Sequence, residues 1–418
     1  MHSNAAHSNS GQNMAHFIGL DIGTSAVRCV VGMIDTNDGG KPSIIGHGSA
    51  PNMGVRKGVV VHVDDVTEAI IQAVTEAERL SGTQINRATI NVNGVHIEGI
   101  DSKGVIAISA ANREISTEDR LRVEEAATVI KMPPNREIIQ FFAKNYSLDG
   151  QRNIKDPVGM HGVRLEVDAH LVTAASPNLR NLDMALEKAQ ITPTHHTLSS
   201  LASAEAVLGR QQKEAGTVVL DIGAGTTNFI VIEDGEVQHI AVLPIGGIHL
   251  TNDLAIGLKT ELDVAERVKV EHATLGVPKR ATAIIRQGDQ DHHFAMDDVN
   301  MIVEARVEEL FEYVNKELIR IRRARKLPGG IVLTGGSAKL PGLADFAKEQ
   351  LQLPARVGKL QSVTGLVDTI DDPAYCTVVG LMLLDMLLLP EAHGVGNYGG
   401  SSAKAYRMVE GLFGRFRK

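Results

Sequence analysis

Two stretches of the chain repeat one pattern of residues that could bind a phosphate and a metal ion. The first, FIGLDIGTSAVRCVVGMI, runs from Phe17 to Ile34, and the second, VVLDIGAGTTNFIVI, runs from Val218 to Ile232. Each has an apolar run, then Asp-Ile-Gly, a small polar turn and a second apolar run. Small residues let the N–H groups of a turn approach a phosphate closely, and Thr and Ser hydroxyls add donors. The repeat therefore predicts two phosphate-binding hairpins from duplicated halves.

The aspartate at the head of each turn could serve a metal ion. Asp21 and Asp221 are placed to hold a hydrated Mg²⁺, because hard oxygen ligands suit this ion and it keeps several waters. A third glycine turn, LTGGSAKLPGL, follows a predicted strand at Ile331–Thr334 and precedes a predicted helix. Its Gly-Gly-Ser would lie flat against a base or ribose. Glycine hairpins also occur for structural reasons alone, but two with matching flanks and a third turn favour nucleotide binding.

Alternating strand and helix patterns surround these turns, which indicates an α/β fold. Residues 17–34 and 217–245 read as strands joined by turns, and residues 104–175 look inserted between the first strands and a helix at 178–190. The other predicted strands are 88–92, 104–109 and 163–174. The other predicted helices are 59–80, 117–130, 299–325 and 378–389. Residues 256–327, which include the third of these, are predicted to be a charged and mainly helical segment.

Composition excludes several classes of protein. The 418 residues carry a net charge of −8, which argues against a nucleic-acid binder by bulk electrostatics. The two cysteines, Cys29 and Cys376, exclude a disulfide framework and a multi-cysteine metal site. The pairs His195-His196 and His292-His293, the second in a predicted exposed loop, lack ligands at a recognisable spacing and are interpreted as surface or structural residues.

The three turns, in this order and spacing, resemble those of the actin-like ATPase superfamily. Further stretches are similar to the FtsA family of bacterial cell-division proteins within it: NIKDPVGMHGVRLEV, LASAEAVL, LPIGGIHLTNDLAIGL, AERVK and PAYCTVVGL. The resemblance extends over about residues 17–389 and resumes in the C-terminal tail. It implies an actin-like, ribonuclease H-like duplicated fold, with two major domains around a nucleotide cleft and an FtsA-type inserted subdomain.

The resemblance also implies domain boundaries. They are a disordered leader at 1–14, subdomain 1A at 15–96 and 176–213, the inserted subdomain 1C at 97–175, subdomain 2A at 214–255 and 328–390, subdomain 2B at 256–327, a flexible linker at 391–403 and an amphipathic helix at 404–418.

A nucleotide site follows from the resemblance, with ATP and Mg²⁺ as its ligands. The implied nucleotide-binding residues are Asp21, Gly23, Thr24, Ser25, Asp221, Gly223, Gly225, Thr226, Thr227, Glu266, Lys269, Gly335, Gly336 and Ser337. Asp21 and Asp221 would hold Mg²⁺ through water.

Three departures from the family pattern bear on activity and contacts. Asn228 stands where the family often has Asp, and Ala143-Lys144 replace a usual Pro-Gln. At the start of SSLASAEAVL, Ser199 and Ser200 stand where many active members have a Glu or Gln that orients the attacking water, and Glu205 lies further along. We therefore expect at most a slow ATPase and name no catalytic residue.

The resemblance implies partners as well. The segment 256–327 would take the C-terminal peptide of FtsZ, and Arg306, Lys316 and Arg320 could meet an acidic peptide, although a solvated charged face is the plainer interpretation of each residue alone. The inserted subdomain would contribute to filament contacts and to recruiting later division proteins.

The last fifteen residues are typical of a membrane-surface anchor. Behind a Gly- and Ser-rich linker, Tyr406, Val409, Leu412, Phe413 and Phe416 share one helix face, and Arg415, Arg417 and Lys418 lie nearby. Burying this face would contribute roughly 4–8 kcal/mol before ordering costs.

The resemblance, together with the basic amphipathic tail, thus implies a filament-forming, ATP-binding adaptor that tethers FtsZ filaments at the septum, on the cytoplasmic side of the membrane. Two alternatives stay open. A small-molecule kinase of the same superfold would need a catalytic Asp beside its substrate pocket and has no use for a basic tail. A pilus-assembly relative lacks such a tail.

Overall fold

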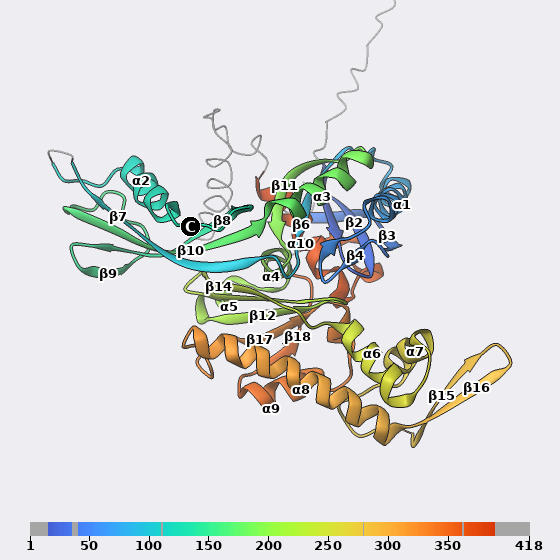
Figure 1. The fold of residues 1–418 in the computed structure, drawn as a ribbon. Coiled ribbons are helices and arrows are strands. Elements are labelled where there is room, and N and C mark those ends of the chain that lie inside the picture. Colours follow the sequence, from blue (N-terminus) through green and yellow to red (C-terminus); the bar gives the residue numbers. More distant parts are fainter. Residues whose placement is uncertain (1–15, 36–40, 110–111, 279, 362, 389–418) are drawn as a thin grey trace, which may run out of the picture.

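A computed structural model describes residues 16–35, 41–109, 112–278, 280–361 and 363–388. The expected leader, linker and C-terminal helix lie outside these residues. Figure 1 shows two sheet-containing bodies one above the other, with an inserted sheet projecting to one side of the upper body.

The first body is built on a six-stranded sheet with strand order β11-β6-β1-β2-β3-β19. Helix α1 lies against β3, and α10 lies against β1, where a Cβ at Gly19 would come within 2.3 Å of the Val378 carbonyl oxygen. The bounds are β1 (His16–Ile22), β2 (Ala26–Asp35), β3 (Lys41–Pro51), β6 (Arg87–Val92), β11 (Thr192–Leu198), β19 (Thr364–Gly365), α1 (Val63–Ser81), α3 (Ser176–Lys188), α4 (Ser199–Val207), α5 (Arg210–Ala215) and α10 (Cys376–Leu388).

The second body is built on a five-stranded sheet with order β14-β13-β12-β17-β18, so β14 is an edge strand. Figure 1 shows α8 and α9 below this sheet and the β15–β16 hairpin projecting beyond α7. The bounds are β12 (Thr217–Ile222), β13 (Thr227–Glu233), β14 (Glu236–Leu243), β17 (Gly330–Thr334), β18 (Ala355–Val357), β15 (Thr282–Gln287), β16 (Gln290–Ala295), α6 (Gly247–Leu258), α7 (Leu262–Glu271), α8 (Met296–Arg320) and α9 (Leu343–Leu351).

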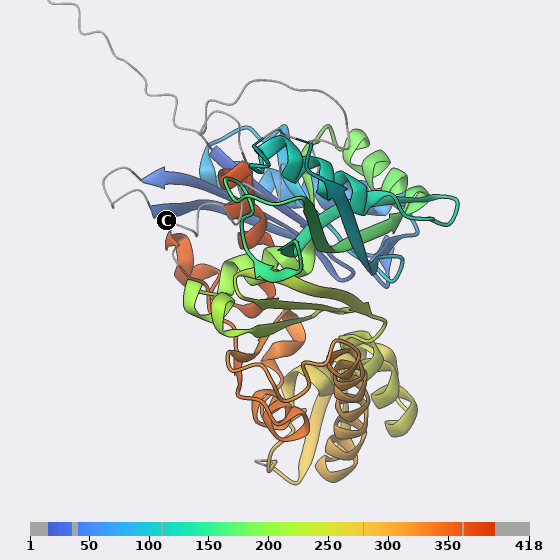
Figure 2. The same ribbon diagram turned by 90° about the vertical axis from the view of Figure 1, so that its left-hand side faces the viewer.

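An inserted four-stranded sheet, with order β7-β10-β8-β9, carries its own hydrophobic cluster. Helix α2 covers it and begins with a capping box in which Ser116 and Asp119 bond each other's backbone N–H groups. Figure 2 views the molecule from the side of this insertion. The bounds are β7 (Glu98–Ala107), β8 (Arg136–Leu148), β9 (Gln151–Ile154), β10 (Arg164–Ala175) and α2 (Thr117–Thr128), with short elements elsewhere at β4 (Val55–Arg56), β5 (Val59–Val60), η1 (Gly336–Lys339), η2 (Leu366–Thr369) and η3 (Pro373–Tyr375).

The structure confirms the two predicted hairpins and most predicted helices but corrects three assignments. Residues 59–60 pair with 55–56, so α1 begins at Val63 instead of residue 59. Strands β3, β8, β9 and β11 were not predicted. The segment 256–327 includes the β15–β16 hairpin, and His292-His293 lie in β16 instead of a loop. Burial alternates over only six residues of β15, which is a weak period for sequence to reveal.

Candidate functional site

The two Asp-Ile-Gly turns have the same geometry. The Gly23 N–H donates to the Ala26 carbonyl at 3.0 Å, and the Gly223 N–H donates to the Thr226 carbonyl at 2.9 Å. In each hairpin the Asp is the second-last residue of its strand and pairs with the residue seven positions later, Arg28 or Asn228. The sequence repeat is therefore a structural repeat.

These turns open onto one cavity of about 590 Å³. Its wall includes all the predicted nucleotide-binding residues except Thr227. They are Asp21, Gly23, Thr24, Ser25, Asp221, Gly223, Gly225, Thr226, Glu266, Lys269, Gly335, Gly336 and Ser337. Thr227 is fully buried behind the turn, where its hydroxyl donates to the Ile245 carbonyl at 2.8 Å.

The two turns meet across the cavity. A Cβ at Gly225 would come within 2.8 Å of the Thr24 hydroxyl, and the Asn93 amide donates to the Thr226 hydroxyl at 3.3 Å. The third turn closes on the second, since Gly335 has φ +82° and a Cβ there would be 2.6 Å from an Asp221 carboxylate oxygen. Only glycine satisfies both the positive φ and this approach.

Two buried carboxylates face the cavity. Burial raises the pKa of Asp21 to about 7, the nearby Arg28 charge opposes this shift, and Asp221 adds to it. Burial also raises the pKa of Asp221, although its Oδ2 accepts hydrogen bonds from Asn228 at 3.0 Å and Thr377 at 3.3 Å. The two carboxylates are hard oxygen donors that face one cavity, so this donor set fits a hard divalent cation such as Mg²⁺.

Arg28 is a cavity residue that sequence reasoning missed. Its guanidinium lies 5.4 Å from the centre of the Tyr375 ring, and its buried Nε has no hydrogen-bond partner. A guanidinium held in this way suits a phosphate oxygen. The repeat in the sequence could have identified it. Arg28 follows Asp21 by the same seven positions by which Asn228 follows Asp221, so both residues are expected to lie opposite an aspartate.

The far end of the cavity combines one charged pair with an apolar wall. The Lys269 ammonium donates to Glu266 at 2.6 Å, to the Thr251 hydroxyl at 2.9 Å and to the Gly247 carbonyl at 3.2 Å. The apolar wall consists of Ile248, Val270, Leu340 and Pro341. This end can take an apolar ring with polar groups at its edge.

The residues at the start of α4 offer no carboxylate to the cavity. Ser199 is on the wall, and its hydroxyl accepts a hydrogen bond from Asn91 at 3.2 Å. Ser200 is buried, and Glu205 is turned into a buried ion pair with Lys213 at 2.6 Å. Glu205 therefore does not replace a Glu or Gln at the position of Ser199.

The three cations proposed for an acidic peptide already have carboxylate neighbours on α6 and α8. Arg306 makes a bidentate pair with Asp253 at 2.5 and 2.9 Å. Arg320 contacts Glu317 at 2.7 Å, and Lys316 lies 3.7 Å from Glu312. The positive charge of each of these three side chains is therefore already paired with a carboxylate of the protein.

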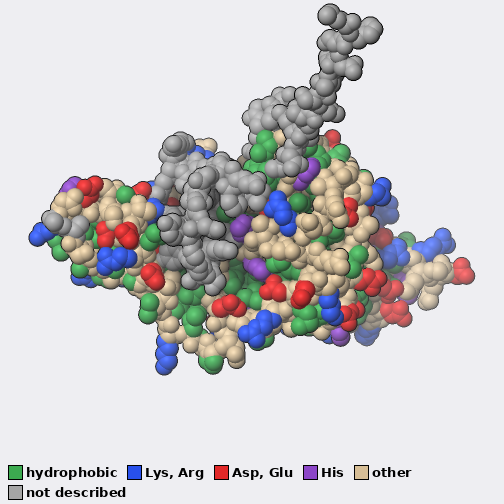
Figure 3. Space-filling view, turned by 90° about the horizontal axis from the view of Figure 1, so that it is seen from above, with side chains coloured by type: hydrophobic (Ala, Val, Ile, Leu, Met, Phe, Trp, Pro, Cys, Tyr) green, Lys and Arg blue, Asp and Glu red, His purple; other side chains and the backbone are tan. Residues whose placement is uncertain are grey.

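Three further observations concern metal ligands, membrane-spanning helices and surface charge. In the described ranges, no group of three or more His, Cys, Asp or Glu side chains is arranged to hold a metal ion by itself. No helix within those ranges has the length and apolar character needed to cross a membrane. Figure 3 shows acidic and basic side chains mixed across the face it presents, without a single-sign surface outside the grey atoms.

Comparison with known proteins places this site in a family. The model of "Cell division protein FtsA" matches residues 218–380, and that of "SHS2 domain inserted in FTSA" matches residues 94–173. The chain is 36% identical over 380 residues to FtsA of Pseudomonas aeruginosa, covering 90% of each chain. It is 38% identical over 371 residues to FtsA of Bacillus subtilis, covering 88% of this chain and 82% of the relative.

Solved structures support the actin-like fold. The PilM–PilN type IV pilus biogenesis complex contains a chain with a TM-score of 0.64 and 18% identity, and the match covers 88% of this chain and 98% of that one. MreB5 of Spiroplasma citri, solved with ADP bound, has a TM-score of 0.53 and 12% identity, with 89% and 96% covered. At sequence identities this low, the matches are evidence for the fold and not for a shared function.

Proposed function

Because the chain belongs to the FtsA family of cell division proteins, we propose that it is an ATP-binding, filament-forming adaptor. It tethers FtsZ filaments to the cytoplasmic side of the cell membrane at the division site and helps to recruit later division proteins. The observation that carries the nucleotide-dependent part is the convergence of two matched Asp-Ile-Gly hairpins and the Gly335 turn on one cavity.

ATP is the proposed ligand of this cavity. The N–H groups and hydroxyls of the two turns and the Arg28 guanidinium would bind the phosphates, and the wall around Val270 and Leu340 would take the base. Asp21 and Asp221 would hold Mg²⁺ through water. When bound, the ion supplies positive charge that neutralises the phosphates and the two carboxylates.

Nucleotide would act mainly as a conformational ligand. The cavity wall comes from both sheets, so a ligand that contacts both favours the closed arrangement of the two bodies. Hydrolysis is at most slow in this proposal, because neither Ser199 nor the buried Glu205 offers a carboxylate to orient water.

The implied domain division is part of the proposal. Subdomains 1A, 1C, 2A and 2B keep the boundaries given above. The second body and the insertion each have a hydrophobic cluster, and the cluster of the first body extends onto Val219, Ile230 and Val332 of the second. FtsZ would bind through its C-terminal peptide at subdomain 2B, near Arg306, Lys316 and Arg320. Because these cations have internal partners, the peptide would have to exchange with the Glu312 and Glu317 carboxylates.

Membrane attachment is assigned to the C-terminal residues. The apolar residues from Tyr406 to Phe416 and the basic residues Arg415, Arg417 and Lys418 would lie in the lipid surface. The tail distinguishes this proposal from a pilus-assembly protein or a small-molecule kinase, neither of which needs a basic amphipathic end.

Titration calorimetry with ATP–Mg²⁺ tests the nucleotide site. We expect binding by the native chain and a loss of at least tenfold in Asp221→Asn, which removes one charge from the site. Asp289→Asn, in the exposed turn of the β15–β16 hairpin, is the matched control. Equal affinity in all three proteins would contradict the assignment of the cavity.

A further inference from the structure

The inserted sheet rests against the edge strand β14 of the second body, and one buried histidine donates no proton but accepts a hydrogen bond in this contact. His170 lies on β10 and is fully buried, and its Nε2 accepts a hydrogen bond from the Ile240 N–H at 3.1 Å. Beside it, Gly99 of β7 approaches the Ile240 carbonyl so closely that a Cβ there would be 2.6 Å from the oxygen. The outward N–H of Ile240, which an edge strand would otherwise leave unpaired, is therefore satisfied by the insertion.

These contacts fix the protonation state of His170. The Ile240 N–H is a donor, so Nε2 must carry a lone pair, and the ring proton lies on Nδ1. Nδ1 is 2.7 Å from Asp101, the residue directly opposite His170 in the β7–β10 register. Lys144 of β8 donates to the same carboxylate at 2.9 Å. The ring is held as the neutral Nδ1–H tautomer.

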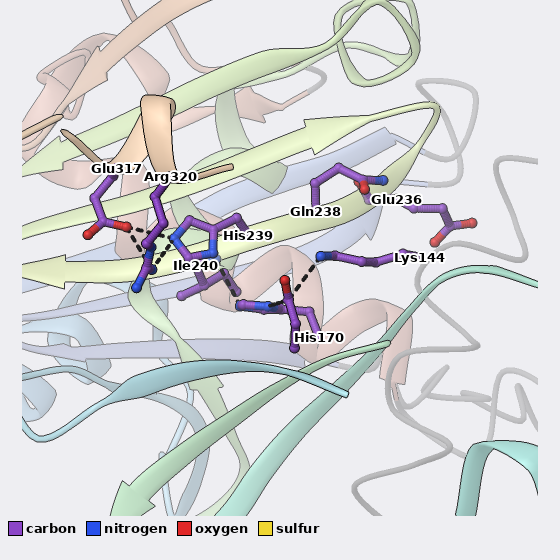
Figure 4. Close-up of polar contacts among 9 residues, drawn as sticks. Lys144, His170, Glu236, Gln238, His239, Ile240, Glu317 and Arg320 are labelled. Atoms are coloured by element: carbon purple, nitrogen blue, oxygen red, sulfur yellow. Dashed lines mark hydrogen bonds and ion pairs between the residues drawn. The ribbon is translucent and has the colours of Figure 1, made fainter. Parts of the chain in front are cut away.

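A second histidine continues the contact to helix α8. His239 precedes Ile240 on β14, is 3% exposed, and its ring lies edge-on to that of His170 with centres 5.1 Å apart. Its Nε2 is 2.9 Å from Glu317 and 2.9 Å from Arg320, both in the last turn of α8. Figure 4 shows the two rings side by side, with Glu317 and Arg320 beyond His239 and Lys144 beyond His170.

We propose that His170 is a latch that fastens the inserted sheet to edge strand β14, and that opening it also loosens the His239 contact to the end of α8. The insertion and α8 touch neighbouring residues of one strand, so displacement of either changes the surroundings of the other. Protonated His170 cannot accept from Ile240, so the latch is closed only when the ring is neutral.

The direction of the pH effect follows from burial. Burial lowers the pKa of His170, and the nearby His239 and Lys144 charges act in the same sense, while Asp101 opposes them. An undocked ring leaves the buried site but keeps Asp101 opposite it, so its pKa is not below the ordinary ~6.5. Docking is then complete above the pKa of the undocked ring and weakens as pH falls through that pKa, by at most about tenfold per pH unit for one proton. Glu317 and Arg320 face His239 rather than His170.

Hydrogen–deuterium exchange of the full chain tests the latch. In His170→Phe we expect residues 236–243 to exchange at least tenfold faster at pH 7.5, with a smaller rise at the end of α8. His170→Gln, which keeps an acceptor, should lie between that variant and the native chain. His196→Phe is the control, because His196 on β11 makes a similar 2.7 Å contact with Asp183 on α3, away from β14 in the chain. Unchanged exchange of β14 in His170→Phe would overturn the proposal.

A titration of the native chain keeps the proposal testable even where a variant does not fold. After correction for intrinsic exchange, protection of residues 236–243 should fall between about pH 7 and pH 5.5, while that of the central strand β12 stays constant. In His170→Gln this pH dependence should be absent. Constant protection of β14 in the native chain over this range would overturn the latch.

Discussion

Single residues decide whether the cavity can hold a phosphate and a cation. Asp21 and Asp221 are buried carboxylates with raised pKa values, and Arg28 is a guanidinium whose Nε has no partner in the structure. Asp221 also accepts hydrogen bonds from Asn228 and Thr377. Together the two carboxylates and the guanidinium give the cavity groups that suit a divalent cation and a phosphate.

Replacing Asp21 should stabilise the nucleotide-free protein at neutral and alkaline pH. The folded carboxyl, with a pKa of about 7, stays protonated where the unfolded one has ionised, so its contribution is present at low pH and lost as pH rises toward 7. We expect Asp21→Asn to raise stability at pH 8 by on the order of 1–3 kcal/mol. Thermal melts of the nucleotide-free native chain should show Tm falling between pH 5 and pH 7, with a flatter curve for the variant. Parallel curves of Tm against pH for the native chain and Asp21→Asn would contradict the raised pKa of Asp21. Asp289→Asn is the control.

Replacing Arg28 should weaken nucleotide binding. A hydrogen bond to a charged group is worth about 1.5–3 kcal/mol, so Arg28→Gln should lose about tenfold to a hundredfold in affinity for ATP–Mg²⁺. Arg28→Lys should lose less, because it keeps the charge. The measurement is competition against a fluorescent ATP analogue. Arg79→Gln, on the exposed face of α1, should match the native chain; an unaffected Arg28→Gln would mean that this guanidinium does not face the phosphates.

At the scale of elements, turns and helices hold these residues in place. The turn at Gly335 brings β17 within contact of Asp221 on β12. Elsewhere in the second body, Arg306 on α8 forms an ion pair with Asp253 on α6. Both contacts join elements that are far apart in sequence, so each can be tested by one substitution.

The third glycine turn offers a matched pair of alanine substitutions. Gly335→Ala forces a Cβ at φ +82° to within 2.6 Å of Asp221, whereas a Cβ at Gly336 meets nothing within 4 Å. We expect a loss of about 2–4 kcal/mol for Gly335→Ala and a change below about 1 kcal/mol for Gly336→Ala, from urea unfolding. Equal losses would show that close approach of this turn does not matter.

The charged residues of α8 should separate structural from binding roles. Arg306→Ala breaks a bidentate pair with Asp253 and should lower stability by about 1–2 kcal/mol, whereas Lys316→Ala, at the exposed pair with Glu312, should change it by less than about 0.5 kcal/mol. Both variants should bind the C-terminal peptide of FtsZ more weakly by fluorescence anisotropy. Native affinity in Lys316→Ala would remove this residue from the peptide site.

Local patterns in the sequence predicted the hairpins and the helix α2 because their signals are contiguous. The two Asp-Ile-Gly stretches contain both strands and the turn, so their geometry depends little on the remainder of the chain. Arg28, Asn93 and Thr377 were missed as cavity residues because they converge from separate elements. Strand β8 and the β15–β16 hairpin were missed because their burial follows tertiary contacts more than a clear period.

At the scale of the whole molecule, helix α10 joins the two bodies behind the cavity. The Thr377 hydroxyl donates to Asp221 of the second body at 3.3 Å and lies 2.8 Å from the Ser203 hydroxyl of the first. Further along, the buried Asp385 accepts from the Ile18 N–H at 3.0 Å and from the Thr89 hydroxyl at 2.8 Å. The apolar run that was predicted as a buried helix therefore packs mainly on α4, β1 and β6 of the first body, and Thr377 near its start reaches the second. Its single carboxylate is fully used inside the protein.

The proposed function has this chain tie FtsZ to a membrane through its C-terminal residues. The direct measurement is flotation of FtsZ filaments with anionic liposomes, in the presence of ATP–Mg²⁺ and either the full chain or a version ending at Ala403. We predict that FtsZ floats with the lipid only when the full chain is present, and more so with ATP–Mg²⁺ than without it. Flotation that is equal for both versions, or absent with both, would contradict the account.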